Sequence, residues 1–181
     1  MKKSRMKIVS SKEVYRSPIF RITEDEAEDG TGFRIRRSII RHNGSAVMMA
    51  VDEKKRVLLV RQYRLPADRY MWELPAGKID DGEKAAQAAK RELIEEAGVR
   101  AKSWKKLAEF YPTPGYGQEK MTVFLATELT HGQAQPMGDE RIEVRWFTKK
   151  ELKEAIQKNE IIDGKTIVGY FYWSTLRAET A

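Results

Sequence analysis

Residues 76–99 read AGKIDDGEKAAQAAKRELIEEAGV and carry the strongest helix signal in the chain. Asp80 and Glu83 have the spacing of a capping box, which predicts that a helix begins there. The residues that follow, up to Ala97, are mostly strong helix formers without Pro or Gly, and Gly98 is typical of a helix C-terminus. We therefore expect one helix that ends at this glycine.

Three glutamates of this helix are expected to share one arc of its surface. At roughly 100° per residue, Glu92, Glu95 and Glu96 lie within an arc of about 100° beside a narrow apolar stripe. Crowded carboxylates repel one another and destabilise a helix. A hard divalent cation with oxygen ligands would offset this repulsion, so the three residues are candidate metal ligands. The alternative is a solvated acidic face, which adjacent glutamates form more often.

The composition indicates one globular domain with a preference for anionic ligands. The 181 residues, of which 41% are hydrophobic and 34% charged, are enough for a folded core. The net charge of +7 favours nucleotides and other anions without distinguishing among them. There is no cysteine, no apolar run approaches the about 20 residues of a membrane helix, and no hydrophobic segment follows the basic N-terminus. We expect a cytoplasmic protein without a membrane partner.

The remaining sequence predicts short strands before this helix and a mixture of strands and helices after it. Residues 23–32, TEDEAEDGTG, are expected to form a charged turn, and the apolar stretches 46–51 and 57–62 a hairpin. Thr148 with Glu151, and then Asp163, are expected to cap two further helices.

The residues in and around the acidic helix also fill a known pattern. Positions Gly77, Glu83, Arg91-Glu92-Leu93, Glu95-Glu96 and Gly98-Val99 match GX5EX7REUXEEXGU, where U is a bulky aliphatic residue. With every fixed position filled, this stretch resembles the Nudix box. The resemblance implies an α/β fold, a Nudix-like α/β/α sandwich with a mixed sheet, and hydrolysis of a pyrophosphate bond. It also implies Mg²⁺ as cofactor, with Mn²⁺ as a possible substitute.

Flanking segments make the resemblance more specific. LLVRQYR at 58–64 and WELPAGKIDDGE at 72–83, together with the box, look like the ADP-ribose pyrophosphatase branch of the Nudix hydrolases. In that branch a proline follows the last box glycine by about 16 residues, and Pro114 stands 16 residues after Gly98. The resemblance implies a nucleoside diphosphate linked to a sugar as substrate, above all ADP-ribose, giving AMP and ribose 5-phosphate. A stiff exposed loop explains the prolines equally well without a ligand.

The resemblance also assigns roles within the site. The expected metal ligands are the Ala76 carbonyl, which lies in a loop turning into the helix, with Glu92, Glu95, Glu96 and Glu140. The candidate catalytic residues are Glu95, Glu96 and Glu140, the last as general base or further ligand. The supporting residues are Gly77, Glu83 and Arg91, of which Glu83 is expected to pair with Arg91. Without the box, Glu140 would be taken for an ordinary surface acid.

The candidate substrate contacts are Phe20, Arg37, Arg64, Pro114 and Glu119. Guanidinium groups match phosphate oxygens, which suggests Arg37 and Arg64, and an aromatic ring such as Phe20 can stack on a nucleobase. By resemblance, Glu119 helps to hold the terminal ribose, in some relatives from the neighbouring subunit. The alternating basic strand that contains Arg37 is explained equally by charge that protects a sheet edge.

We expect residues 1–42 to form a small N-terminal β region and residues 43–181 the Nudix hydrolase domain. The resemblance implies a homodimer in which the N-terminal region is exchanged or shared. No specific nucleic-acid partner is expected, because the basic residues are scattered and no interleaved aromatic and basic patch is present.

Other functions stay open at this point. Within enzymes, the substrate could be an NDP-hexose such as ADP-glucose or GDP-mannose, or a capped RNA 5′ end. A different class is a non-catalytic protein that senses ADP-ribose or NAD. Such a protein would be expected to lose box carboxylates, and all of them are present in this chain.

Overall fold

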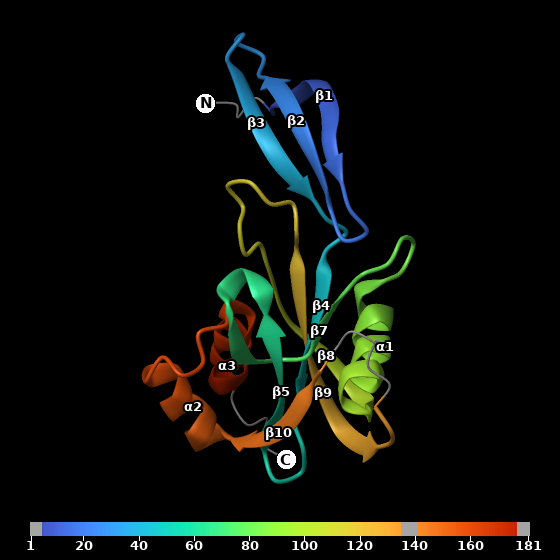
Figure 1. The fold of residues 1–181 in the computed structure, drawn as a ribbon, viewed down its shortest axis with the longest axis vertical. Helices are drawn as coiled ribbons and strands as arrows, with labels where there is room; N and C mark the ends of the chain where they lie inside the picture. Colours follow the sequence, from blue (N-terminus) through green and yellow to red (C-terminus); the bar gives the residue numbers. More distant parts are fainter. Residues whose placement is uncertain (1–4, 135–140, 177–181) are drawn as a thin grey trace. The chain divides into compact units, whose positions relative to one another are not determined.

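The computed structural model describes residues 5–134 and 141–176, which fall into two compact units (Figure 1). One unit contains the chain up to Gly44 together with Tyr111–Lys120, and the other contains Ser45–Phe110 and the chain from Met121. The first unit has strands β1 (Lys7–Arg16), β2 (Arg21–Glu28) and β3 (Arg34–Arg41). The second has β4 (Ser45–Ala50), β5 (Arg56–Arg64), the 3₁₀ turn η1 (Leu65–Ala67), β6 (Arg69–Glu73), β7 (Ala76–Lys78), α1 (Ala85–Ala97), β8 (Val99–Phe110), β9 (Met121–His131), β10 (Glu143–Thr148), α2 (Lys149–Gln157) and α3 (Gly164–Thr175).

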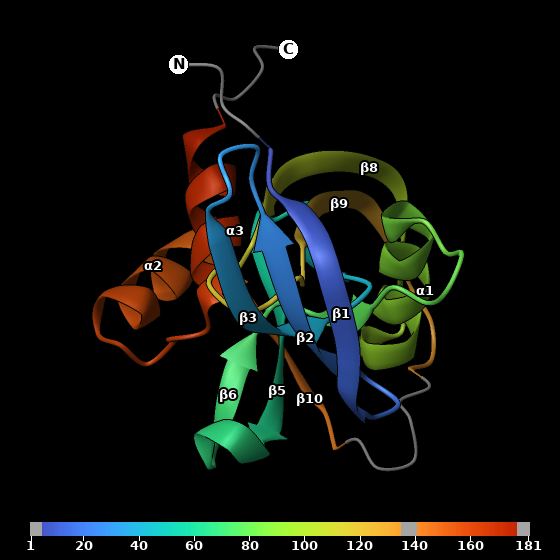
Figure 2. The same ribbon diagram turned by 90° about the horizontal axis from the view of Figure 1, so that it is seen from above.

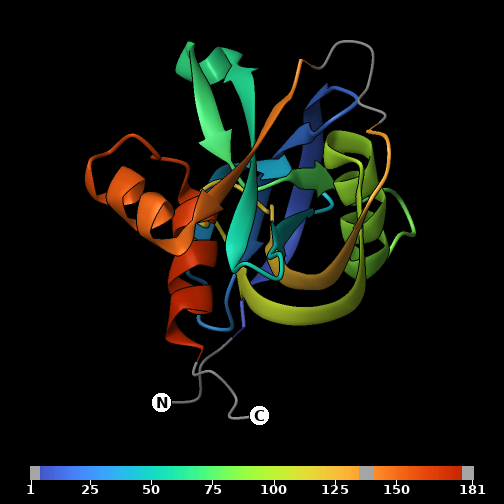
Figure 3. The ribbon, with the colours of Figure 1, turned by 90° about the horizontal axis from the view of Figure 1, so that it is seen from below.

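Two sheets form the centre of the second unit. One has the order β7-β4-β9-β8 and is mixed, because β4 runs parallel to β9 while β7 and β8 are antiparallel to their neighbours. The other has the order β10-β5-β6 and is antiparallel. Figure 3 shows α1 on one side of these strands and α2 and α3 on the other. The predicted α/β/α sandwich with a mixed sheet is therefore confirmed.

The central strand β4 is buried on both faces. Val47 and Met49 pack in the core that includes α2 and α3, whereas Met48 and Ala50 pack in the core that includes Leu93 of α1. A strand covered on both faces needs a continuous apolar run, which SAVMMA supplies. Full burial of each larger side chain stabilises the fold by about 1.5–3 kcal/mol.

Helix α1 begins at Ala85, which is later than predicted, and Lys84 precedes it with an extended backbone. Asp80 and Glu83 form a separate turn before the helix. In this turn Glu83 Oε2 accepts a hydrogen bond from the Asp80 N–H (3.1 Å), and the Glu83 N–H donates to the Asp80 carbonyl (3.0 Å). The same spacing therefore serves a turn instead of a helix cap. The helix ends at Gly98 in a left-handed conformation with φ of 64°, as predicted.

The predicted hairpin of β4 and β5 is wrong. The two strands meet only at a single bridge between Val51 and Val57 and belong to different sheets. Asp52 fixes the connection by accepting from the backbone N–H and Nε of Arg56 at 2.7 and 2.8 Å. Because β4 and residues 57–60 of β5 are apolar and buried on both faces, these runs contain no signal for the sheet that each strand joins.

Helices α2 and α3 begin where the sequence predicts. Thr148 Oγ1 accepts from the Glu151 N–H (3.2 Å) and Glu151 Oε2 accepts from the Thr148 N–H (2.7 Å), which is a complete capping box. Asp163 caps α3 by accepting from the Thr166 N–H at 3.0 Å. Among the helices that the structure describes, none has the length and apolar character to cross a membrane.

The first unit is built on an antiparallel sheet in which β2 lies between β1 and β3 (Figure 2). Most of the stretch predicted as a charged turn belongs to β2 instead. Its acidic residues pair across the sheet with arginines of β3, at 2.7 Å for Glu24 and Arg36 and 2.6 Å for Glu28 and Arg34. Opposite charges on neighbouring strands stabilise a sheet. The sequence of β2 taken by itself gives no sign of this pairing.

The loop Tyr111–Lys120 is joined to this unit by its backbone. The Ile40 N–H donates to the Tyr116 carbonyl and the Gln118 N–H donates to the Ile40 carbonyl, each at 2.8 Å. These two bonds form a parallel bridge opposite Gly117. The proline-containing loop is therefore held by the end of β3.

Asp25 on β2 is a buried carboxylate of the same unit. It accepts from Ser11 Oγ at 2.7 Å and pairs with the Arg41 guanidinium, whose Nε also donates to Thr23 Oγ1 at 3.0 Å. Burial alone would raise the pKa of Asp25, but the hydrogen bonds from Ser11 and Thr23 and the charge of Arg41 outweigh it and lower this pKa.

We predict that Asp25→Asn destabilises the protein by about 1–3 kcal/mol at neutral pH, because Arg41 loses its buried counter-ion. Since the folded-state pKa of Asp25 is lowered, its contribution is complete above the unfolded-state value of about 3.9 and is lost as the pH falls through the folded-state value. Urea unfolding at pH 7 and below pH 4 measures the effect, and the difference between wild type and variant should shrink in acid. If the difference in unfolding free energy does not shrink at low pH, the loss of stability comes from altered packing and not from the lost charge.

Candidate functional site

Arg91 of α1 lies among the acidic side chains of the predicted site. Its Nη1 donates to Glu92 Oε1 at 2.6 Å and to Glu95 Oε2 at 3.0 Å. Its Nε and Nη2 donate to the two carboxylate oxygens of Glu83 at 3.2 and 3.0 Å, and Nη2 also donates to the Lys78 carbonyl at 3.1 Å. The hydrogen bonds with Glu83 raise the pKa of Arg91 and lower the pKa of Glu83. One cation therefore offsets the repulsion that the sequence predicts.

Glu96 is bonded to the loop that enters β7. This glutamate is only 5% exposed, and its Oε2 accepts from the Ala76 backbone N–H at 3.1 Å. The preceding Pro75 carbonyl accepts from the Met48 N–H of β4 at 2.9 Å. The loop is thus fixed both to the acidic helix and to the central strand, and the structure brings the predicted ligands Ala76 and Glu96 together.

Gly77 makes the close approach of β7 to α1 possible. A Cβ atom at this position would overlap Cγ, Cδ and Oε1 of Glu92. A glycine leaves that space to the carboxylate, which accounts for the first fixed position of the box.

The chemistry of the donor set fits a hard divalent cation. Three carboxylates and one backbone carbonyl offer only oxygen, which Mg²⁺ and Mn²⁺ prefer to nitrogen or sulfur. Within residues 5–134 and 141–176, no three acidic or histidine side chains are arranged to hold a metal ion as they stand. Arg91 donates to one oxygen of Glu92 and to one oxygen of Glu95, so the guanidinium holds two of the candidate ligands in place.

Arg64 at the end of β5 lies in the same unit as the carboxylates. Its Nε and Nη2 donate to Glu73 Oε1 and Oε2 at 2.8 and 2.9 Å. Burial lowers the pKa of Arg64, but the hydrogen bonds with Glu73 and the charges of Glu96 and Asp163 outweigh burial and raise it. Arg64 therefore lies within electrostatic reach of the acidic helix.

Two buried charged residues of this region were missed by sequence reasoning. Glu73 is 2% exposed and Lys165 is 7% exposed, and the two side chains form an ion pair. Lys165 Nζ also lies 3.0 Å from Asp163 Oδ1. The signals available were a glutamate directly before the LPAG segment and a lysine two positions after a helix cap. Nothing in the sequence links the two, because they stand 92 positions apart.

Phe20 and Arg37, two of the predicted substrate contacts, lie in the first unit. The Phe20 ring lies 5.9 Å from the Tyr15 ring. Arg37 is exposed on β3, and its Nη1 donates to the carbonyl of Arg36 at 2.7 Å. These contacts are local to the unit, so the roles of both residues stay predictions.

Pro114 and Glu119 lie in the loop of the same unit. Pro114 belongs to a turn in which the Gly117 N–H donates to the Thr113 carbonyl at 2.7 Å. Glu119 Oε1 lies 4.0 Å from Nδ1 of His42, a histidine to which sequence reasoning gave no role. Glu140, the candidate general base, lies outside the described residues, and its role stays a prediction.

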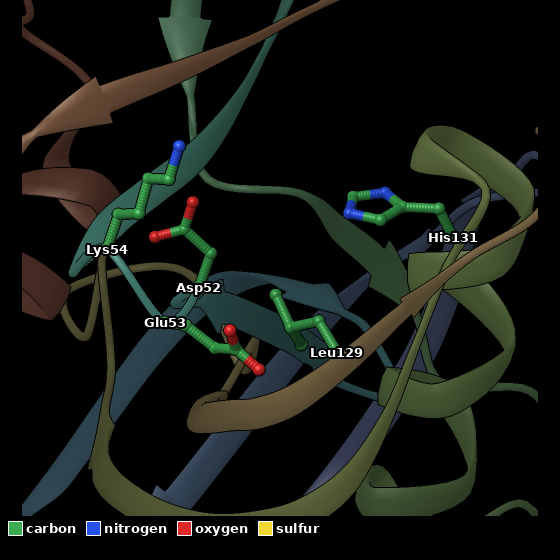
Figure 4. A pocket seen from close by; sticks show the side chains of 5 residues that line it. All are labelled: Asp52, Glu53, Lys54, Leu129 and His131. Atoms are coloured by element: carbon green, nitrogen blue, oxygen red, sulfur yellow. The ribbon is translucent and has the colours of Figure 1, made fainter.

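A separate pocket of about 270 Å³ opens beside the connection between β4 and β5 (Figure 4). Its lining residues are Asp52, Glu53, Lys54, Leu129 and His131. None of these is a predicted site residue, and Asp52 is engaged with Arg56.

Comparisons with known proteins agree with the pattern of the helix. Residues 41–167 match the family described as NUDIX domain. The chain is 31% identical over 174 residues to an ADP-ribose pyrophosphatase of Bacillus subtilis, covering 95% of this chain and 94% of that protein. It is 34% identical over 151 residues to a GDP-mannose pyrophosphatase of Cronobacter sakazakii, covering 78% of each.

A solved structure described as an ADP compounds hydrolase resembles this chain with a TM-score of 0.78. The match covers 94% of this chain and 92% of that one, at 22% sequence identity. At this identity the likeness shows the fold alone.

We predict that Gly77→Ala weakens divalent-cation binding by about 10–100-fold, because the new methyl group takes the space of the Glu92 carboxylate. Stability should change little, since the displaced atoms are the end of a flexible side chain. Titration calorimetry with Mn²⁺ measures the affinity, and thermal unfolding measures the stability. In a Glu92→Ala background the glycine substitution should have no further effect. A full effect in that background would show that Gly77 acts through the backbone instead.

Proposed function

The chain belongs to the NUDIX family, and on that basis we propose that it hydrolyses the pyrophosphate bond of a nucleoside diphosphate linked to a sugar. ADP-ribose is the proposed substrate, with AMP and ribose 5-phosphate as products. The observation that carries the proposal is the bond between buried Glu96 and the Ala76 backbone, which joins the acidic helix to the loop predicted to offer a carbonyl ligand. The similarity to the Bacillus subtilis protein over nearly the whole chain supports the choice of ADP-ribose.

The proposed cofactor is Mg²⁺, with Mn²⁺ as a substitute. The residues that would hold it are the Ala76 carbonyl, Glu92, Glu95 and Glu96. A bound Mg²⁺ supplies charge that neutralises the pyrophosphate oxygens and lowers the pKa of an attacking water.

The remaining residues of the site support these ligands. Glu83 fixes the Arg91 guanidinium from one side, and this guanidinium holds Glu92 and Glu95 on the other. Glu96 is held by the Ala76 N–H, so its carboxylate has one fixed orientation. Arg64 offers a guanidinium to the phosphates in the same unit. Because phosphoryl transfer depends mainly on positioning and charge stabilisation, such fixed groups are what the reaction requires.

An NDP-hexose is the second candidate substrate. It is favoured by the 34% identity to a GDP-mannose pyrophosphatase, which has the same pyrophosphate chemistry and a different sugar. A purely binding role is disfavoured, because every carboxylate of the box is present.

We also propose that the protein forms a homodimer through residues 1–42, with residues 43–181 as the hydrolase domain. The support is a set of large apolar side chains that are exposed on the first unit: Ile8, Val9, Val14, Tyr15, Ile19 and Phe33. All ten residues of β1 are exposed, and extensive exposed apolar surface is more often covered by a partner than left in water. A cytoplasmic location is proposed from the cysteine-free composition.

The test of the proposed function is product identification with Mg²⁺ and a panel of ADP-ribose, ADP-glucose, GDP-mannose and capped RNA. We expect AMP to be released from ADP-ribose in preference to products from the others. Chelation with EDTA should abolish turnover, and added Mg²⁺ should restore it. Cleavage of the NDP-hexoses alone would change the proposed substrate from ADP-ribose to an NDP-hexose. The absence of product from every compound would refute the proposed hydrolase activity.

Loss of a residue that only supports a metal ligand lowers activity by about 10–100-fold. Because Glu96 is a proposed ligand itself, we expect Glu96→Gln to lower kcat for ADP-ribose by more than that. The affinity for substrate should change far less. Glu24→Gln, a change of the same kind at a half-buried glutamate of β2 outside the box, is the control. A Glu96→Gln variant that keeps most of its activity would remove Glu96 from the site.

The dimer is tested by Val14→Lys, which places a charge among the exposed apolar side chains of β1. We expect sedimentation velocity to show a dimer for the wild type and a shift toward the monomer for the variant, because the lysine would have to be buried unpaired in the interface. Leu176→Lys, at an exposed leucine of the second unit, should leave the dimer intact. A monomeric wild type would refute the proposal.

A further inference from the structure

Glu73 is a buried carboxylate that receives two cations. It ends β6, and both of its oxygens accept from Arg64, through Nε at 2.8 Å and Nη2 at 2.9 Å. Oε2 also accepts from Lys165 Nζ of α3. The pairing with Arg64 uses one edge of the guanidinium and leaves Nη1 for a further acceptor.

Lys165 is itself anchored by the first turn of α3. Its Nζ lies 3.0 Å from Asp163 Oδ1, and the other oxygen of Asp163 accepts from the Thr166 N–H at 3.0 Å and from Thr166 Oγ1 at 2.6 Å. Thr166 Oγ1 in turn accepts from the Leu74 N–H at 2.8 Å. The start of α3 therefore holds the two consecutive residues Glu73 and Leu74, which stand just before β7 and its first residue Ala76.

A purely structural link would not require these charges. Burying a lysine and a glutamate costs free energy of desolvation, and apolar residues of similar size often stabilise a core equally well. The exposure of this network rises toward Arg64, whose side chain is 41% exposed while those of Glu73 and Lys165 are 2% and 7% exposed. The charged chain thus runs from the core to one guanidinium that solvent and ligands can reach.

We propose that Lys165 is a positioning residue for the substrate pyrophosphate, acting through Glu73 on Arg64. Lys165 holds the Glu73 carboxylate in one place, and this carboxylate sets the plane of the guanidinium. Because Lys165 also shares the negative charge of Glu73, Arg64 is not fully neutralised and keeps its attraction for phosphate oxygens. The inference rests on the proposed function only in taking a pyrophosphate as the ligand of Arg64.

The test is the binding of ADP, a pyrophosphate ligand that requires no turnover, measured by titration calorimetry in the full-length protein. Lys165→Met keeps the length of the side chain and removes its charge. We expect it to weaken ADP binding, and to raise KM for ADP-ribose, by about tenfold, the lower end of the effect of groups that orient a ligand-binding side chain. The effect on kcat should be smaller, since the carboxylates of α1 are not changed.

A double-mutant cycle distinguishes positioning from a general loss of structure. In an Arg64→Ala background, Lys165→Met should have no more than a roughly twofold further effect, because residues that act as one unit are not additive. Ile161→Val, a buried substitution in the same core that changes no charge, is the control for stability and should bind ADP as the wild type does.

Each outcome decides the proposal. Equal effects of Lys165→Met with and without Arg64, or normal ADP binding by Lys165→Met, would overturn it. A wild type that does not bind ADP would also overturn it, whereas a wild type that binds ADP but hydrolyses no NDP-sugar would refute the proposed function alone.

If Lys165→Met does not fold, Asp163→Asn is measured instead, because asparagine keeps the helix cap and weakens only the hold on Lys165. It should then weaken ADP binding several-fold, and unchanged binding would overturn the proposal.

Discussion

The ion pairs of Arg91 are the interaction on which the arrangement of the site depends. Carboxylates on one face of a helix repel one another, and the fold places a single guanidinium in contact with Glu83, Glu92 and Glu95. The acidic helix can therefore pack against the sheet without a bound cation. The same contacts hold Glu92 and Glu95, two of the proposed metal ligands, in fixed positions beside Glu83.

The segment between β6 and β7 is held from three sides, and each contact comes from a different element. Thr166 of α3 bonds Leu74, Met48 of β4 bonds Pro75, and Glu96 of α1 bonds the residue that follows. A loop fixed in this way presents its carbonyl in one orientation. Since α3 lies near the end of the chain and α1 in its middle, the geometry of the site depends on the whole second unit.

Features that depend on local spacing could be predicted from the sequence, and features that depend on distant partners could not. The acidic arc of α1 and the caps of α2 and α3 follow from residues three or four positions apart. The start of α1 was placed too early because the spacing of Asp80 and Glu83 suits a turn as well as a helix cap. The part of β2 beyond Thr23 was taken for a turn, because its charges are explained only by arginines of β3. The pair of Glu73 and Lys165 has no local signal at all.

The parallel bridge between β3 and the loop Tyr111–Lys120 means that the two units are interleaved along the chain. The polypeptide passes from one unit to the other after Gly44, after Phe110 and after Lys120. The N-terminal sheet is therefore not an appendage that can be deleted cleanly, since a chain truncated at this sheet would leave the backbone of the loop without its partner at Ile40. An insertion or deletion at the end of β3 would therefore change the backbone partner of a loop that lies far along the sequence.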